Sequence, residues 1–298
     1  PQSSISGKLR VRGLKQPVYE TDSRISLNLS EVRNMLPDSI ATSMDGEIHA
    51  HIRSAAQLNP DSIPEEIIEL LFRKGNYTVD MQNVSAKLFQ YPDYPLHKVR
   101  GKFTLDSTLL TVNQCSGEAA GILFGIDSTT VRNLYETVIL NQPELLEINT
   151  RISMGDLNYN RLLALLPADT TNEDKSEDST QYNIAMKGKA RIRSFTYDSV
   201  YLENFSTLFN VQDSIYTFDQ LQFDAFGGHI NTSANYILKP ENRAIIQMRN
   251  NISTMNIRKL LEDFDDFEAF YDPAIRSENL SGLLTCDFYT RADIIGDS

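Results

Sequence analysis

Two histidines two residues apart, His49 and His51, have a spacing that could support metal binding. Imidazole nitrogens are common ligands of zinc, copper and nickel, and alternate residues of a β-strand lie on one face. Glu47 and Arg53 share the alternation phase of the two histidines, while the opposite phase is aliphatic. We therefore expect the histidines to lie on a solvated strand face, and we predict no metal site there.

The other chemically capable residues lack partners at a useful spacing. His229 follows two glycines without the G-x-S-x-G motif of serine hydrolases, and His97 has no visible partner. The acidic run 262–268 lacks the glycine that the sixth position of an EF-hand loop requires. No P-loop and no G-x-G-x-x-G motif is present. We predict no catalytic residue, no cofactor and no metal, and thus a protein that is not an enzyme.

Composition excludes some partners. The 298 residues carry a formal net charge of −12, which disfavours nucleic acid because phosphate binding needs clustered lysine and arginine. Hydrophobic residues make up 41% of the chain, enough for a sizeable core, but no run reaches the ~18 apolar residues of a membrane span. The chain opens directly on a strand-like pattern without a signal peptide. We expect it to be a section of a longer protein.

The two cysteines, Cys115 and Cys286, lie far apart in the sequence and form no C-x-x-C or Cys/His ligand pattern. Both fall on apolar phases of strand-like segments, where a free thiol acts as a small apolar group. We predict two buried free thiols, with a disulfide as the alternative.

The elements that must position these residues are mainly strands. Period-two alternation dominates, as in 8–12, 189–193 and 147–154, and residues 244–252 place Ala244, Ile246, Met248, Asn250 and Ile252 on one phase. One-sided alternation indicates antiparallel sheet with one dry and one wet face. The predicted fold is mainly β, a repetitive, curved antiparallel β-sheet array, groove- or sandwich-like, with a few short helices.

Helical signals are few. Pro64 and two acids begin a segment that Lys74 and Gly75 end, which predicts a helix over 64–74. Shorter helices are predicted at 30–36, 158–166 and 256–264. The polar stretch 171–181 is expected to be a mobile acidic loop.

Internal similarity is the most informative feature. Segment 106–112 resembles segment 213–218, which lies 107 positions later in the chain. The same offset aligns Ala120-Gly121 with Gly227-Gly228. For the residues that precede segment 106–112, the best offset is 106. A short helical segment recurs at 29–36, 157–163 and 255–261, each followed by a glycine-led strand, at 46–51, 188–193 and 282–287. We expect 1–75 to end a preceding repeat and include helix 64–74, 76–170 to form repeat unit 1, and 182–298 to form repeat unit 2 and begin the next.

Residues 221–234 resemble the hairpin of two strands joined by a small residue and two glycines in the C-terminal region of the AsmA/TamB family. The following strand 244–252, helix 255–261 and glycine-led strand 282–290 match the family's order of elements, and 76–166 match it more loosely. The resemblance implies a periplasmic section of a protein anchored in the inner membrane by an N-terminal helix. It also implies a bridge-like lipid transfer protein that contributes to outer-membrane biogenesis, with phospholipid or another acyl lipid as cargo and envelope proteins as further partners.

If the resemblance holds, acyl chains lie along the apolar phase of the longer strands, since leaving water stabilises them by ~0.8 kcal/mol per methylene. The lipid-groove candidates are Ile192, Phe218, Leu221, Phe223, Ile230, Ala234, Tyr236, Ile246, Met248, Leu284, Cys286 and Phe288. Their counterparts in the first unit are Val79, Met81, Val99, Phe103, Leu105, Leu110, Val112, Ile148 and Ile152. The same stripes could form the closed core of a structural or assembly scaffold that binds no lipid. A carbohydrate-binding module ranks last, because the chain has no tryptophan for an aromatic platform.

Overall fold

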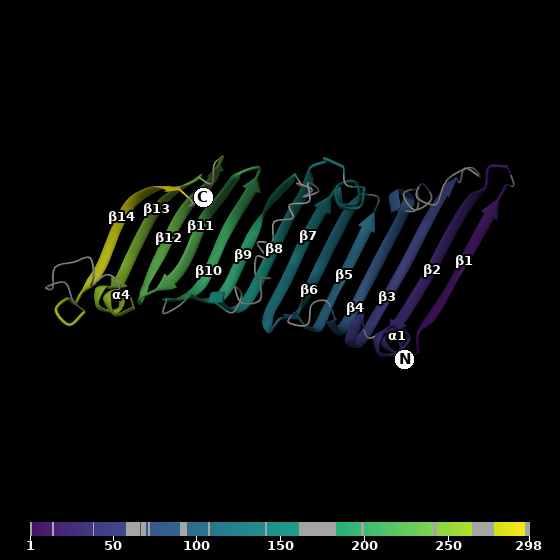
Figure 1. Ribbon diagram of the computed structural model, residues 1–298, viewed down its shortest axis with the longest axis horizontal. Coiled ribbons are helices and arrows are strands. Elements are labelled where there is room, and N and C mark those ends of the chain that lie inside the picture. Colours follow the sequence, from purple (N-terminus) through teal and green to yellow (C-terminus); the bar gives the residue numbers. More distant parts are fainter. Residues whose placement is uncertain are drawn as a thin grey trace. The chain divides into compact units, whose positions relative to one another are not determined.

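The computed structural model describes residues 2–295 except 14, 38, 58–65, 67–69, 71, 90–93, 107, 141, 161–182, 198–199, 241–242 and 264–276 (Figure 1). Its strands are β1 (Ser4–Arg12), β2 (Val18–Asn28), β3 (Ala41–Gln57), β4 (Gly75–Leu88), β5 (Leu96–Asp106), β6 (Leu109–Ala119), β7 (Ile122–Arg132), β8 (Leu146–Asn158), β9 (Ile184–Tyr197), β10 (Val200–Gln212), β11 (Ile215–Ala225), β12 (Gly228–Lys239), β13 (Arg243–Asn256) and β14 (Leu283–Ile295). The shorter elements are α1 (Leu29–Met35), a π-helical turn η1 (Tyr135–Ile139) and α4 (Ile257–Asp263). The mainly β fold predicted from alternation is confirmed.

The chain forms two compact units. The first consists of Pro1–Arg151 with Ser176–Asn183, and the second of Ile152–Lys175 with Ile184–Ser298. Strand β8 has residues in both units. In the first unit the strand order is chain order from β1 to β7, and in the second it is chain order from β9 to β14. Each pairing within a unit is antiparallel. β13 and β14 curve visibly along their length (Figure 1). Each unit is thus a curved antiparallel meander, in which hairpins bring successive segments side by side.

The short helices α1 and α4 agree with prediction within a residue or two. The side-chain oxygen of Asn28 accepts hydrogen bonds from the backbone N–H groups of Ser30 and Glu31, which satisfies two donors at the start of α1. The Asn256 side chain accepts from the N–H of Lys259 in the same way, just before α4. The helix predicted over 64–74 is helical at the described residues 66, 70 and 72–74, and the remainder lies outside the described residues.

Two other predictions fall largely or wholly outside the described residues. Of the helix predicted at 158–166, residue 158 ends β8, residues 159 and 160 are helical, and the rest is not described. The acidic loop predicted at 171–181 is likewise not described.

β-Bulges interrupt several strands at recurring positions. Lys98 and Asn204 adopt left-handed backbone conformations in β5 and β10, as do Gln114 and Gln220 in β6 and β11. Each pair is 106 positions apart (204 − 98 and 220 − 114). The strand register shifts next to Lys98 and Asn204 and next to Gln114 and Gln220. Because a bulge bends the strand that contains it, the two meanders are curved by the same device at equivalent places. The repetitive strand arrangement is thereby confirmed.

Hairpin geometry corrects the alignment of the repeat. Ala120 and Gly121 both have positive φ between β6 and β7, and so do Phe226 and Gly227 between β11 and β12. Two successive residues with positive φ make the tight turn whose twist suits a β-hairpin. The offset at the turn is therefore 106, not 107: Ala120-Gly121 corresponds to Phe226-Gly227, and Gly228 begins β12.

The glycines expected to lead strands occupy different places. Gly46 lies inside β3 at a register shift, with φ +103°, and Gly188 lies inside β9. Only Gly282 precedes its strand directly. The alternation therefore extends further towards the N-terminus in β3 and β9 than the glycine-led pattern predicts.

Each unit contains one cluster of buried apolar side chains. In the first unit Leu29 of α1 packs with Val84, Val99, Val112 and Cys115. The cluster of the second unit consists of Ala225, Ile230, Ile252 and Met255, and Leu260 of α4 packs against it. Each short helix therefore covers one end of its sheet, not its whole length.

Candidate functional site: the apolar face of the second unit

Strand register places all the lipid-groove candidates on one face of the second unit. Across β11, β12 and β13, Phe218 is opposite Ala234, which is opposite Met248. Ile252 of β13 is opposite both Ile230 and the half-buried Cys286. The other candidates join this face through the pairs Phe223–Ile230, Leu221–Thr232, Tyr236–Ile246, Asn250–Phe288, Met255–Leu284 and Phe205–Ile192. We refer to this surface as the apolar face.

Aromatic rings extend the apolar face from strand to strand. The rings of Phe205 in β10 and Phe223 in β11 are stacked with centroids 6.3 Å apart. Those of Tyr216 and Tyr236 are tilted at 5.7 Å. These ring contacts follow from the strand register, because side chains at paired or nearby positions of neighbouring strands lie next to each other on the same face of the sheet.

Burial varies along the apolar face. Ile230 is 8% exposed at the end near α4, whereas Ala234, Tyr236, Ile246 and Met248 are half-buried. On the outer strand β14, Phe288 is 45% exposed. Among the described residues of this unit, apolar side chains away from α4 are thus covered by their neighbours in the sheet but not by a second layer.

The first unit repeats the pattern. Val79, Phe103 and Val112 stand opposite one another across β4, β5 and β6, and Leu105 is opposite Leu110. Met81 pairs with Gly101, and Val99 with Val84. Ile148 of β8 alternates in phase with Thr150, which hydrogen-bonds Thr129 of β7. Ile152 continues this phase on β8 but belongs to the second unit.

The apolar face also carries polar side chains that sequence reasoning did not single out as functional. Thr232 and Asn250 are 2% and 6% exposed, and the Thr232 hydroxyl donates to Asn250 Oδ1 over 2.7 Å. Thr207 of β10, 4% exposed, donates instead to the carbonyl of Asp219. The only sequence signal for this polar pair was that Asn250 falls on the apolar phase of its strand. Its partner Thr232 could not be predicted, because the partner of a side chain depends on the register between strands.

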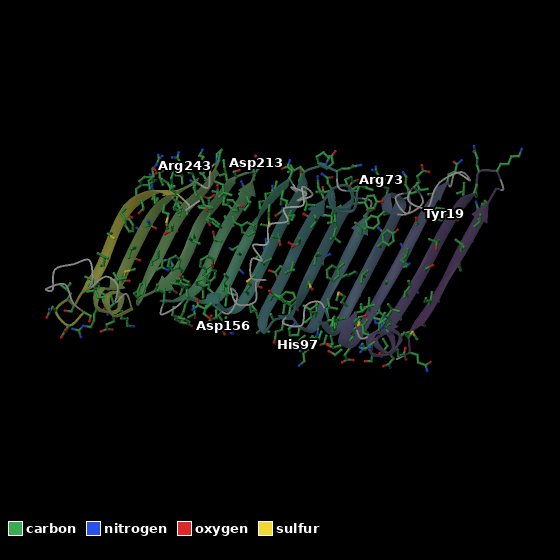
Figure 2. All side chains as sticks on the ribbon, in the orientation of Figure 1. Tyr19, Arg73, His97, Asp156, Asp213 and Arg243 are labelled. Carbon is green, nitrogen blue, oxygen red and sulfur yellow. The ribbon has the colours of Figure 1, made fainter. Side chains whose placement is uncertain are left out.

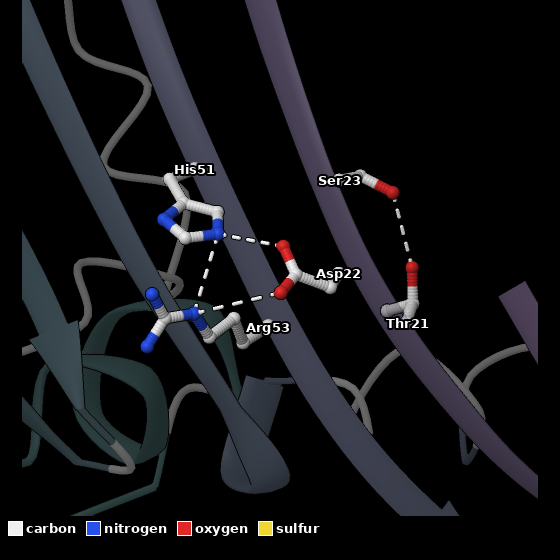
Figure 3. Close-up of polar contacts among 5 residues, drawn as sticks. All are labelled: Thr21, Asp22, Ser23, His51 and Arg53. Atoms are coloured by element: carbon white, nitrogen blue, oxygen red, sulfur yellow. Dashed lines mark hydrogen bonds and ion pairs between the residues drawn. The ribbon is translucent and has the colours of Figure 1, made fainter. Parts of the chain in front are cut away.

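The opposite face is polar, and His49 and His51 lie on it as expected. His51 Nε2 is 2.8 Å from Asp22 Oδ1, and Arg53 Nε is 4.0 Å from Asp22 Oδ2 (Figure 3). The hydrogen bond with His51 lowers the pKa of Asp22, with nearby positive charge adding to the effect. His49 Nδ1 contacts the Ser26 hydroxyl at 3.1 Å. His49 Nε2 also lies 3.3 Å from Glu47 Oε2, so these residues form a polar network with two carboxylates on the strand face.

A second polar cluster lies near the end of β8, where Figure 2 labels Asp156. Arg193 Nε donates to Asp156 Oδ1 over 2.7 Å, Arg193 also bonds the second carboxylate oxygen, and the Ser194 hydroxyl donates over 2.6 Å. These bonds, led by that from Arg193, lower the pKa of Asp156 to about 2. The planar guanidinium thus bonds both carboxylate oxygens and links β8 to β9.

A shallow polar depression of about 550 Å³ lies beside the Phe226-Gly227 turn. His229 Nδ1 is 2.8 Å from Asp224 Oδ1, and the Asn204 amide donates to the other carboxylate oxygen over 2.7 Å. Hydrogen bonds from Asn204 and then His229 lower the pKa of Asp224. Lys259 of α4 also lines the depression. The polar groups satisfy one another, and His229 is exposed.

Both cysteines are free thiols, as predicted, but only Cys115 is fully buried. Burial raises the pKa of the Cys115 thiol. In the part of the chain that the structure describes, no group of three or more His, Cys, Asp or Glu side chains is placed to hold a metal ion. No helix among those same residues combines the length and apolarity needed to cross a bilayer.

Comparisons with protein-family models, with curated proteins and with solved structures found no match to this chain.

Proposed function

We propose that the chain is a non-catalytic lipid carrier whose apolar face holds the acyl chains of a phospholipid or a related lipid. The observation that carries the proposal is the strand register, because it gathers all the groove candidates on one face whose side chains are half-buried over much of its length. Contiguous exposed apolar surface in a folded protein is typical of a binding surface.

The energetics of such a surface need no catalytic group. Each methylene that leaves water contributes ~0.8 kcal/mol, so a lipid with two long tails is retained by apolar contact alone. Neighbouring strands offer a similar surface at each step, which lets a chain shift along the sheet without a large barrier. The headgroup would remain in water at the border of the face.

The proposed setting is that of AsmA-like proteins: a periplasmic section of an inner-membrane-anchored protein that moves lipid for outer-membrane biogenesis. The support is the ordered set of a hairpin, a strand, a short helix and a further strand in β11 to β14. A scaffold that binds envelope proteins and carries no lipid is the alternative that the following experiment tests.

The test places the same negative charge on either face of β13. Met248→Glu puts a carboxylate on the apolar face, whereas Gln247→Glu puts one on the polar face next to it. Burying a charge among acyl chains is strongly unfavourable. We expect Met248→Glu to reduce co-purified lipid at least about tenfold, measured by native mass spectrometry and lipid extraction, and Gln247→Glu to leave it unchanged.

Circular dichroism would establish that both variants keep the wild-type strand content. Equal lipid retention in the two folded variants would rule out the apolar face as the lipid site. A wild-type chain that carries no lipid and takes up no fluorescent acyl probe would favour the scaffold.

A further inference from the structure

Asn250 stands in the middle of the apolar face. It lies between Met248 and Ile252 along β13, and it is opposite Thr232 of β12 and Phe288 of β14. Only 6% of the residue is exposed. A carboxamide at such a place is unfavourable once an apolar layer covers it and excludes water, unless its polar atoms find partners.

One end of the Asn250 amide is satisfied within the sheet. The Thr232 hydroxyl donates to Asn250 Oδ1 over 2.7 Å. The Nδ2 atom carries two further N–H donors, and the structure gives it no hydrogen-bond acceptor among the described residues. The side chain therefore presents a donor on a surface that is otherwise apolar.

The equivalent strand pair of the first unit, β7 and β8, is also joined by a side-chain hydrogen bond, but at another position, since Ile126 is the counterpart of Thr232 at the offset of 106. There Thr129 of β7 and Thr150 of β8 hydrogen-bond each other, hydroxyl to hydroxyl. Two hydroxyls suffice to join the strands, so strand pairing alone does not require a carboxamide. The extra donor of Asn250 calls for a second role.

The residues around Asn250 indicate which kind of hydrogen-bond acceptor suits its Nδ2 atom. Arg249, Arg243 and Arg291 alternate onto the opposite face, so among the residues that the structure describes the apolar face offers no cation near Asn250 to compensate a phosphate or carboxylate. A neutral carbonyl oxygen flanked by hydrocarbon meets the donor without a charge being buried. The ester carbonyl of an acyl lipid has this chemistry.

We infer that Asn250 Nδ2 donates a hydrogen bond to the ester carbonyl of an acyl lipid held on the apolar face. This inference rests on the proposed function and adds its substrate class. Acyl-ester lipids are held more tightly than ether-linked lipids of the same chain length, because an ether oxygen is a poorer acceptor and leaves the Asn250 donor unpaired beneath the bound lipid.

The experiment compares two probes that differ only in this group: diacyl phosphatidylethanolamine and its dialkyl ether analogue with the same headgroup and chain lengths. Delipidated chain is offered an equimolar mixture in vesicles, and the bound ratio is read by native mass spectrometry. We expect the wild type to favour the ester by about five- to tenfold, the effect of one hydrogen bond to a buried group.

Asn250→Leu is expected to bind both lipids with no preference. Since that change leaves the Thr232 hydroxyl without its acceptor, the double variant Thr232→Val/Asn250→Leu replaces both polar partners by apolar groups of similar shape and protects against misfolding. Asn251→Leu is the matched control, because Asn251 lies on the polar face and donates to Asp287 Oδ1 over 2.6 Å. It should keep the wild-type preference.

Three results would overturn the inference. If wild-type chain binds ester and ether lipids equally, Asn250 serves the sheet alone, while the proposed lipid function stands. If the double variant retains the preference, the donor lies elsewhere. If neither lipid binds, the proposed function fails together with the inference.

Discussion

At the scale of single residues, Asp156 shows how an exposed charge can still secure two strands. Its carboxylate receives hydrogen bonds from Arg193 and Ser194, two neighbouring residues of β9, so the contact adds to the pairing of β8 with β9. The pKa of Asp156 is lowered to about 2 from an ordinary value of 3.8, first by the hydrogen bond from Arg193.

This shift predicts an acid-dependent loss of stability. A carboxyl group whose pKa is lower in the folded state stabilises the fold above its unfolded pKa, 3.8, and loses that contribution as pH falls through about 2. We expect wild-type chain to become less stable between pH 4 and 2 more steeply than Asp156→Asn, measured as denaturant midpoints at each pH.

The matched control is Asp287→Asn, which removes an exposed carboxylate bonded only to a neutral amide. It should follow the wild-type slope. Parallel curves for wild type and Asp156→Asn would contradict the role given to the Arg193 pair.

Some features of single residues could be predicted from the sequence and others could not. Alternation correctly assigned His49 and His51 to a solvated face, because the phase of a strand residue follows from its position alone. It did not predict that Arg193 meets Asp156, 37 positions away, or that Thr232 meets Asn250. Such partners depend on the register between strands, which a single bulge changes.

At the scale of elements, the bulges set the curvature of each meander. Gln220 has φ +50° and is exposed, with no glycine at the position to relieve its left-handed backbone. A non-glycine residue is strained there, and a β-branched residue more so.

The effect of a substitution at Gln220 on stability should therefore depend on how readily the new residue adopts a left-handed backbone conformation. We expect Gln220→Val to destabilise the chain by about 1–2 kcal/mol and Gln220→Gly to be neutral or stabilising by up to about 1 kcal/mol. Gln222→Val, two residues on in the same strand, should cost less than about 0.5 kcal/mol, because β-branched residues suit strands. Urea unfolding monitored by circular dichroism measures all three.

If valine costs the same at 220 and 222, the strain assigned to the bulge is absent. The bulge positions were not predicted from the sequence, because Lys98, Gln114 and Gln220 carry no turn signal. Asn204 is of a residue type that adopts left-handed backbone more readily, but it stands alone within a strand. Helices α1 and α4 could be predicted, since polar caps and a repeated leucine pattern mark them.

At the scale of the whole molecule, stability is distributed along the chain. Within each unit a strand contacts the strands before and after it, and the two buried clusters share no residue. Chains built in this way resemble repeat proteins, whose stability is a sum of local and nearest-neighbour terms.

A substitution in one cluster should therefore leave the other intact. Val99→Ala removes a side chain that is 5% exposed, at an expected cost of about 2 kcal/mol. Native-state hydrogen exchange should show faster amide exchange in β4 to β6 and unchanged exchange in β11 to β13. A uniform decrease in protection across both units would instead indicate a single cooperative structure.

Chain-order pairing has a consequence for how the molecule is made. A polypeptide that emerges N-terminus first, from a ribosome or through a translocation pore, exposes its strands in the order in which they pair. Within each unit the partner of a new strand is already present when that strand appears, so no strand edge waits for a distant segment still to be synthesised. Each strand can then pair as soon as it emerges, and the apolar face forms one strand at a time.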